Sequence, residues 1–401
     1  MPRSITLTAL DIGTSFVKGI CGRKDLKTGD IEVLAQLEYP CFGVRSGEVV
    51  KPEQVSQIIL KVKEKLSQQA GIRINEVLVN IGGPHLFTIP SQGLVSVSRA
   101  DQKISKEDIQ RVLRAAQAIN LPSNKEILDI LPREFLVDGE GGVKDPLGLE
   151  GIRLEAKVLL ICIFSPILEN LEKALSLADL QILDVVSSPL AASRVVLTPQ
   201  QKELGVCLVE IGAGTTEITV FEKGDLIDFA VFPIGSANIT NDIAIGLRTE
   251  IHTAERIKKE FGGLNSREKK GKREKIKIPE SSLAFPKKFL RDIIEARVSD
   301  IFNEVQKTLK KISGGILLPA GIVLTGGGSL LPGLVEFSKQ KLKLPCRLGK
   351  IKEIPNVEDL QFSTCAGVLL NGFDFKQEEK EKGFGGSFGE KLRRLFRIFL
   401  P

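Results

Sequence analysis

The chain has 401 residues, of which 42% are hydrophobic and 26% are charged, and its formal net charge is +6. This composition is typical of a globular protein, and the length predicts two or more domains. A net charge this modest gives no reason to expect nucleic-acid binding, and two histidines leave little scope for a histidine metal site or a Ser-His-Asp triad.

Six scattered cysteines without a CxxC pair indicate reduced thiols in a cytosolic protein. We expect no signal peptide, because the N-terminus runs directly into a strand-like stretch. The longest apolar runs, such as "VLLICIF" at 158–164, are too short to span a bilayer. Any contact with a membrane would therefore use the surface of the protein.

Strand-like and helix-like stretches alternate over the first part of the chain. Residues 5–13 predict a buried strand that ends in a glycine turn, and further strands follow, as at 76–83. Between them, an apolar stripe at helical spacing predicts an amphipathic helix that begins at Pro52 and ends at Gly71. This alternation is typical of an α/β domain.

After residue 83 the pattern changes. Residues 85–99 predict extended structure, residues 105–119 predict a helix with Ser105 as its N-cap, and residues 129–164 predict strands with turns. We therefore expect a small α+β unit, residues 84–164, inserted into a larger domain.

A second α/β half begins near residue 204. Helices are expected at 237–262 and 286–312, and residues 320–342 predict a strand, a glycine turn and a helix. The intervening stretch 264–282, "LNSREKKGKREKIKIPESS", has little apolar content and predicts a solvated loop.

The end of the chain predicts a tethered amphipathic helix. Residues 373–388 are charged and then glycine-rich, which predicts a flexible linker, and residues 389–401 predict the helix. Its apolar face comprises Phe388, Leu392, Leu395, Phe396 and Phe399, and the cations Lys391, Arg393, Arg394 and Arg397 lie off that face. Such a helix packs on its own domain or lies in a membrane interface, and the flexible tether favours an anionic membrane surface.

Three strand–glycine-turn units could form a phosphate site together, although each alone predicts only a turn. The first, "LDIGTSFVKG", contains Asp11, Gly13, Thr14, Ser15 and Lys18. The second, "VEIGAGTTEI", contains Glu210, Gly212, Gly214, Thr215, Thr216 and Glu217. The third, "LTGGGSLLPG", contains Gly326, Gly327, Gly328 and Ser329.

Their combination predicts a nucleotide clamped between the two halves. Glycine lets the backbone approach a phosphate, and successive N–H groups form a concave nest for it. Asp11 and Glu210 could hold Mg²⁺ through water and are the two candidate catalytic residues, while Lys18 could neutralise phosphate charge. Neither a Walker A loop nor a Rossmann fingerprint is present.

The motifs "DIGTSFVK", "EIGAGTTE" and "LTGGGS" resemble the superfamily of actin, chaperone ATPases and sugar kinases. Within it, the chain most resembles the FtsA family of bacterial cell-division proteins, which tether FtsZ to the membrane. The resemblance also includes "GVKDPLGLEGIRLEAKV", "NITNDIA" and the amphipathic tail, so it covers nearly the whole chain. It implies an α/β, actin-like (ribonuclease H-like) fold of two halves.

The resemblance also implies how the chain is divided. The FtsA-type insert, 84–164, would serve self-assembly and contacts with other division proteins. A smaller lobe, 240–312, would take the C-terminal peptide of FtsZ, with Arg297 as a contact. The remaining parts would be the first half, 1–83 and 165–200, the second half, 201–239 and 313–372, the linker, 373–388, and the membrane-targeting helix, 389–401.

ATP binding is implied residue by residue. The first phosphate loop would comprise Gly13, Thr14, Ser15 and Lys18, the second Gly212, Gly214 and Thr215, and the adenosine loop Gly327 and Gly328. Glu255 and Lys258 would flank the ribose and base. Glu210 departs from the family's usual aspartate, and its extra methylene could disturb Mg²⁺–water geometry. We therefore expect weak or absent ATPase activity.

The expected function is an ATP-dependent membrane adaptor that tethers FtsZ filaments and self-assembles at the cytoplasmic face of the membrane, at the division site. One alternative is a PilM-type adaptor of pilus assembly, which has no reason to carry the membrane tail. A sugar or carboxylate kinase is a further alternative, but no separate acidic motif supplies the base for an acceptor hydroxyl.

Overall fold

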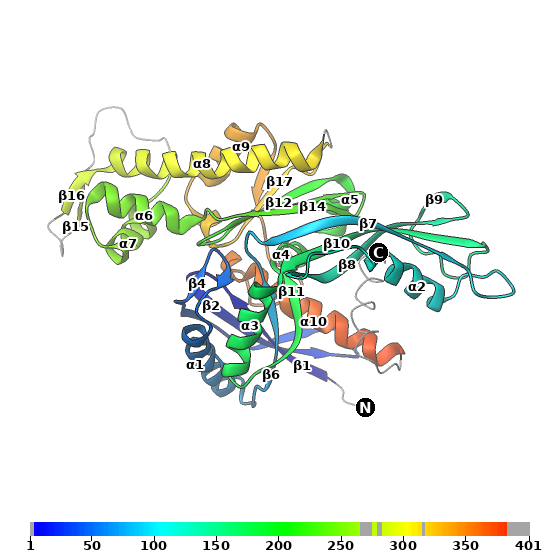
Figure 1. The fold of residues 1–401 in the computed structure, drawn as a ribbon. Helices are drawn as coiled ribbons and strands as arrows, with labels where there is room; N and C mark the ends of the chain where they lie inside the picture. The colour runs from blue at the N-terminus through cyan, green and yellow to red at the C-terminus, as the bar shows by residue number, and fades with distance from the viewer. Residues whose placement is uncertain (1–3, 265–274, 279–282, 315–316, 383–401) are drawn as a thin grey trace.

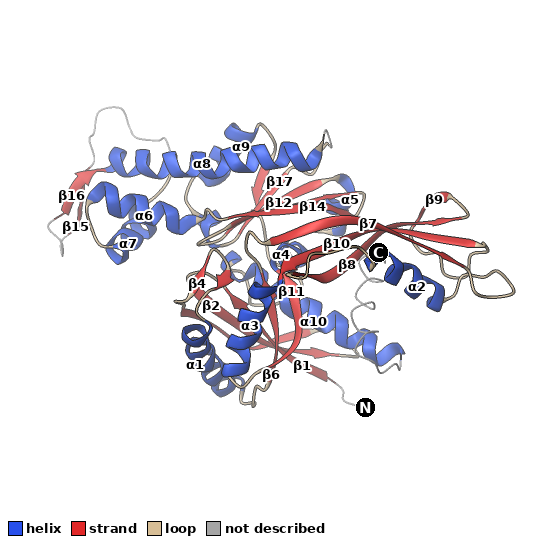
Figure 2. Cartoon of the chain, viewed as in Figure 1, coloured by secondary structure: helices blue, strands red, loops and turns tan. Residues whose placement is uncertain are grey.

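The computed structural model describes residues 4–264, 275–278, 283–314 and 317–382 (Figure 1). In these residues, helices and mixed sheets form two α/β halves, an inserted unit and a smaller lobe (Figure 2). Apart from those near the end of the chain, the residue bounds that the sequence predicts for these parts remain predictions.

The first half contains β1 (Ser4–Ile12), β2 (Phe16–Asp25), β3 (Ile31–Pro40), β4 (Val44–Arg45), β5 (Glu48–Val49), α1 (Pro52–Ala70), β6 (Glu76–Ile81), α3 (Ser165–Leu177), β11 (Gln181–Ser187) and α4 (Ser188–Val196). Its main sheet has the strand order β11-β6-β1-β2-β3. The central strand β1 pairs antiparallel with β2 and parallel with β6. The turn between β1 and β2 is the first glycine turn, so the sheet fixes its position.

The second half contains α5 (Pro199–Leu204), β12 (Val206–Ile211), β13 (Thr216–Glu222), β14 (Asp225–Phe232), β17 (Ile322–Thr325), the 3-10 helix η2 (Gly327–Leu330), α9 (Leu334–Leu342), β18 (Cys346–Leu348) and the 3-10 helix η3 (Leu360–Phe362). Its sheet has the order β14-β13-β12-β17-β18. Here β12 pairs antiparallel with β13 and parallel with β17, as β1 does with β2 and β6. The two halves thus share one construction, and each has a glycine turn after its central strand.

The inserted unit contains β7 (Leu86–Ser96), α2 (Lys106–Gln117), β8 (Lys125–Val137), β9 (Glu140–Val143) and β10 (Arg153–Phe164). Its sheet has the order β7-β10-β8-β9 and its own apolar core beneath α2. The predicted N-cap of α2 is confirmed, because the Ser105 hydroxyl accepts from the Asp108 N–H at 3.2 Å and the Asp108 carboxylate accepts from the Ser105 N–H at 2.9 Å. This reciprocal capping box fixes where the helix begins.

The smaller lobe contains α6 (Ser236–Leu247), α7 (Ile251–Phe261), β15 (Lys275–Ile278), β16 (Leu283–Pro286) and α8 (Lys287–Ser313). The prediction of a solvated loop over 264–282 is wrong for β15, which pairs antiparallel with β16. Ile276 and Ile278 are buried, while the lysines between and before them face solvent. This period-two alternation is a strand signal that the high charge of the stretch obscured.

The helix α10 (Ser363–Lys382) corrects two predictions about the end of the chain. First, the apolar residues of α10 from Cys365 to Phe373 are buried in a core in which α10 packs on α4, β1 and β6 of the first half, although the sequence predicts that residues up to 372 belong to the second half. The approach is close, because a Cβ at Gly367 would lie 1.8 Å from the Ala191 carbonyl oxygen and one at Gly372 would lie 2.0 Å from Leu78. Glycine at these positions therefore lets α10 lie directly on α4 and β6.

Second, α10 continues to Lys382, through much of the predicted linker 373–388. Phe373 is fully buried and Asp374 pairs with Arg194 at 3.2 Å, which anchors the helix past residue 371. The residues that follow, glutamine, glutamate and lysine, are strong helix formers, so their intrinsic propensity favours continuation of the helix.

The predicted membrane helix falls outside the described residues. This applies to Phe388, Lys391, Leu392, Arg393, Arg394, Leu395, Phe396, Arg397 and Phe399. Among the residues that are described, none of the helices combines the length and apolar character needed to span a bilayer.

Candidate nucleotide site

The first two glycine turns lie against each other where the two halves meet. The two turns are built alike: the Gly13 N–H donates to the Phe16 carbonyl at 3.0 Å, and the Gly212 N–H donates to the Thr215 carbonyl at 2.9 Å. A Cβ at Gly214 would lie 2.5 Å from the Thr14 hydroxyl oxygen. The contact leaves no room for a side chain at residue 214, and it brings together the two predicted phosphate loops.

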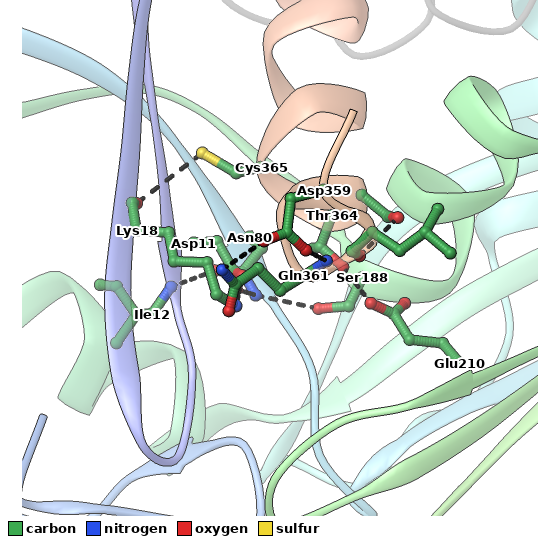
Figure 3. A network of polar contacts seen from close by, with 12 residues as sticks. Asp11, Ile12, Lys18, Asn80, Ser188, Glu210, Asp359, Gln361, Thr364 and Cys365 are labelled. Carbon is green, nitrogen blue, oxygen red and sulfur yellow. Dashed lines mark hydrogen bonds and ion pairs between the residues drawn. The ribbon is translucent and has the colours of Figure 1, made fainter. Parts of the chain in front are cut away.

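A polar network holds the base of the first turn (Figure 3). Lys18 lies opposite Asp11 in the β1–β2 ladder, and its Nζ is 3.0 Å from Asp11 Oδ2. Asn80 of β6 donates to Asp11 Oδ1 at 2.9 Å and to the Ser188 hydroxyl at 3.1 Å. Burial alone would lower the pKa of Lys18, but the charge of Asp11 and its hydrogen bond outweigh this, so the pKa is raised. Lys18 is therefore a fixed cation beside the first turn.

Glu210 is the penultimate residue of β12, the central strand of the second half, and points toward the same network (Figure 3). Its Oε1 accepts from the Thr364 hydroxyl at 2.7 Å, at the start of α10. Its Oε2 is buried, and no hydrogen bond reaches it from the described residues. Burial raises the pKa of Glu210 to about 7, with Thr364 opposing the rise and Asp11 adding to it.

Glu217 is a further buried carboxylate that the sequence reasoning did not assign to the site. It lies opposite Glu210 in the β12–β13 ladder and is 6% exposed. Within the described chain its Oε2 also has no hydrogen-bond partner. Burial raises its pKa well above the usual range, and Glu210 and Asp11 add to this. The signal for it was present, since Glu217 is the second acidic residue of the "EIGAGTTE" motif.

This donor set fits a hydrated divalent cation. Buried carboxylate oxygens without a partner, on Glu210 and Glu217, can accept hydrogen bonds from the water shell that Mg²⁺ retains. In the part of the chain that the structure describes, no three histidine, cysteine, aspartate or glutamate residues are arranged to bind a metal directly. The fit is therefore to a cation held through water.

The third glycine turn packs on the second. A Cβ at Gly326 would lie 2.6 Å from the Ile211 carbonyl oxygen, and one at Gly328 would lie 2.5 Å from the Ile211 side chain. Gly327 differs, because the nearest atom to its hypothetical Cβ is Cβ of Gln361, at 3.6 Å. The predicted adenosine loop thus lies beside the predicted phosphate loops, with Gly327 as its least crowded residue.

Glu255 and Lys258 form an ion pair on α7, with 2.7 Å between Nζ and Oε2. Lys258 also donates to the Ser236 carbonyl at 3.1 Å and to the Thr240 hydroxyl at 2.8 Å. The Ser236 N–H in turn donates to the Gly212 carbonyl at 2.8 Å. The pair is therefore connected to the second phosphate turn through the start of α6.

Arg297 lies elsewhere, on α8 of the smaller lobe. Its guanidinium donates to both carboxylate oxygens of Asp242 on α6, at 2.6 and 3.0 Å, and lies 3.4 Å from Asp300. Exposed apolar side chains occur on the same lobe, notably Ile245 and Ile251. Arg297 thus belongs to a separate surface, and its predicted contact with FtsZ remains a prediction.

Comparison with known proteins identifies relatives over nearly the whole chain. Residues 207–367 match the model of the family "Cell division protein FtsA", and residues 83–162 match that of the "SHS2 domain inserted in FTSA". The cell division protein FtsA of Pseudomonas aeruginosa is 36% identical over 389 residues, which cover 95% of this chain and 92% of the relative. The cell division protein FtsA of Bacillus subtilis is 33% identical over 365 residues, which cover 90% of this chain and 82% of the relative.

Solved structures with the same fold are more distant in sequence. The PilM–PilN type IV pilus biogenesis complex matches with a TM-score of 0.66 at 18% identity, covering 92% of this chain and 99% of that one. MreB5 of Spiroplasma citri bound to ADP matches with a TM-score of 0.56 at 13% identity, and the match covers 95% of this chain and 100% of that one. At these identities the likeness shows the fold alone, which is the actin-like α/β fold.

Proposed function

The chain belongs to the FtsA family of cell-division proteins, and from this premise we propose that it is an ATP-binding membrane adaptor for FtsZ filaments. The observation that carries the nucleotide part of this proposal is the contact between Thr14 and Gly214. It places two glycine turns, one from each half, at a single point. A phosphate chain there would meet backbone N–H groups from both halves, so binding it would hold the halves together.

The residues around this point support ATP with Mg²⁺ as the ligand. Lys18 supplies a fixed positive charge, and the carboxylates Asp11, Glu210 and Glu217 supply acceptors for a hydrated cation. Bound Mg²⁺ would offset the charge of the phosphates and of these carboxylates. The structures of MreB5 from Spiroplasma citri are described as bound to ADP and to AMPPNP, and they support the same class of ligand here.

Weak or absent hydrolysis follows from the position of Glu210 in this proposal. Its carboxylate accepts from Thr364 on α10, so one oxygen is already engaged with the protein. Its side chain is also one methylene longer than the family's usual aspartate, which would disturb the near-octahedral geometry of water bound to Mg²⁺.

The smaller lobe is the proposed site for the C-terminal peptide of FtsZ. Ile245 is 76% exposed and Ile251 is 64% exposed, and Arg297 and Asp242 form a partly exposed ion pair on the same lobe. The apolar side chains of a peptide could pack on Ile245 and Ile251, and its acidic side chains could bind the guanidinium of Arg297. The inserted unit is proposed to serve self-assembly and contacts with other division proteins.

The membrane anchor is proposed from the sequence, because residues 383–401 lie outside the described residues. Its apolar face would be buried at the headgroup boundary, and each cation near an anionic surface adds about 1 kcal/mol. A single short helix binds marginally, so self-assembly would strengthen attachment through avidity. The protein would then act at the cytoplasmic face of the membrane, at the division site.

Flotation with anionic vesicles tests this function. The full chain is compared with a chain truncated after Lys382, because α10 ends there and the fold remains whole. We expect the full chain to float and the truncated chain to stay in solution, with equal ATP affinity. Equal behaviour of both chains in flotation would contradict the membrane part of the proposal. It would restore the PilM-type adaptor, since that function requires no membrane tail.

A further inference from the structure

The inserted unit is covalently part of the first half, yet one edge of its sheet lies against the second half. Its edge strand β7 runs alongside β14, the edge strand of the second sheet (Figure 1). The Thr88 hydroxyl donates to Asp228 Oδ1 at 2.5 Å. Two edge strands from different halves are thus joined by a side-chain hydrogen bond.

Two further contacts join other parts of the inserted unit to β14. Lys144, just after β9, forms an ion pair with Asp225, the first residue of β14. The guanidinium of Arg133 on β8 donates to the Ile227 carbonyl. Burial lowers the pKa of Arg133, and burial raises the pKa of Asp225 although Lys144 opposes this. Arg133 and Asp225 are half-buried in the structure, in keeping with these shifts.

The base of the inserted unit is connected to the first phosphate turn. The Gly47 N–H, at the tip of the β4–β5 hairpin, donates to the Thr14 hydroxyl at 2.9 Å. The next residue, Glu48, is buried, and its Oε1 lies 2.6 Å from Nδ1 of His85. The ring of His85 packs on that of Phe164, with 5.7 Å between centroids.

His85 and Phe164 are the residues at which the chain enters and leaves the inserted unit. The hairpin is also held to the helix after the unit, because Asn170 of α3 donates to the Val49 carbonyl at 3.0 Å. The inserted unit therefore has two attachments: its base to the first phosphate turn, and its edge to β14.

We propose that the inserted unit reports the nucleotide state of the cleft, because any rotation between the two halves must turn this unit or break its contacts with β14. Thr88 and Lys144 are positioning residues in this device, and Glu48 and His85 fix the base on which the unit turns. The proposal rests on the proposed nucleotide site and goes beyond it. It assigns the contact between the inserted unit and β14 a role in coupling ATP binding to the surface used for assembly.

The test uses the full chain and reads binding and coupling separately. Hydrogen exchange of β7 and β8 is measured with and without ATP and Mg²⁺, and ATP affinity is measured on the same samples. In the unaltered protein we expect ATP to change exchange in both strands. In the double variant Thr88→Val, Lys144→Met this change should be lost while the protein still binds ATP. Because coupling is reciprocal, the difference in ATP affinity between this variant and the unaltered protein measures its size.

Two further variants exclude a merely structural effect. Thr88→Ser alone, with Lys144 unchanged, keeps the hydroxyl, so this variant should show the same ATP-dependent change in exchange as the unaltered protein. Lys157→Met removes a lysine of the inserted unit that pairs within it, with Glu134 at 2.6 Å, and should leave the change intact.

The outcomes distinguish the two proposals. The coupling is overturned if ATP still changes hydrogen exchange of β7 and β8 in the double variant. It is also overturned if the unaltered protein binds ATP and the exchange of neither strand changes. If the unaltered protein binds no ATP, the proposed function and the coupling fall together, and the affinity measurement identifies that case.

Discussion

Glu210 and Glu217 face each other across the β12–β13 ladder, and each has a buried carboxylate oxygen without a hydrogen-bond partner in the described chain. Two such groups beside Asp11 destabilise the folded protein whenever they are ionised and no cation is bound. The site thus favours a ligand that brings positive charge and water. This relationship gives the first prediction.

Without Mg²⁺, the protein should be less stable at pH 8 than at pH 5, in part because of Glu210. Its folded pKa, about 7, lies above its unfolded value. The folded state therefore binds the proton more tightly, so stability is highest below the unfolded pKa and falls as pH rises through about 7. In Glu210→Gln the difference in Tm between pH 5 and pH 8 should shrink, by on the order of 2 to 5 °C.

Differential scanning calorimetry of both proteins at the two pH values measures this. A pH dependence of Tm that is the same in the variant and the unaltered protein would show that Glu210 does not titrate in this range. Adding Mg²⁺ should raise Tm at pH 8 more than at pH 5, because only the ionised carboxylates attract the cation.

Gly214→Ala should weaken ATP binding by at least about tenfold. The new Cβ would lie 2.5 Å from the Thr14 hydroxyl oxygen, and a strain of about 1.4 kcal/mol corresponds to a tenfold loss of affinity. The turn of Thr14 or the turn of residue 214 must shift to make room for the methyl group. Gly141→Ala is the matched control, since its Cβ would meet its nearest atom at 3.4 Å, on the inserted unit. Titration with a fluorescent ATP analogue measures both, and equal affinities for the two variants would count against the site.

Lys18→Gln should reduce ATP affinity by roughly 10- to 100-fold, because it removes a charged hydrogen-bond donor worth about 1.5–3 kcal/mol. Lys63→Gln is the control: Lys63 is also a mostly buried lysine, but it bonds the Ala178 and Asp179 carbonyls, away from the turns. Isothermal calorimetry with ATP and Mg²⁺ measures the affinities. A similar loss in both variants would point to general destabilisation and away from a phosphate contact.

Arg297→Ala should lower the affinity for the FtsZ C-terminal peptide by about 10-fold or more, as expected for loss of a charge-assisted contact. Arg291→Ala serves as the control on the same helix, with its Nη2 3.7 Å from Asp292. Fluorescence anisotropy of labelled peptide measures both affinities. If both variants bind the peptide as tightly as the unaltered protein does, Arg297 is not part of the interface, and the exposed apolar residues of the lobe would be the remaining candidates for it.

The sequence predicted those features that depend on local patterns. The capping box at Ser105 and the helix between Pro52 and Gly71 follow from residue types at fixed spacing, and both are observed. The three glycine turns were expected to converge, and the contact of Thr14 with Gly214 brings two of them together. Their role in binding ATP remains a prediction.

Features that depend on distant residues could not be predicted in the same way. The return of α10 to the first half depends on Gly367 meeting Ala191, which are far apart in the chain. The place of Glu217 in the site depends on the β12–β13 register, which sets it opposite Glu210. The strand β15 was missed because lysines alternate with its two buried isoleucines.

The most direct test of the central claim is recruitment of a labelled FtsZ C-terminal peptide to anionic vesicles, with ATP and Mg²⁺ present. The unaltered chain should carry the peptide to the floating fraction. Leu395→Glu places a charge on the apolar face of the tail, so this variant should bind the peptide equally well in solution and carry none of it to the vesicles. Equal flotation of the peptide with both proteins, or none with either, would contradict the account of this chain as a membrane adaptor.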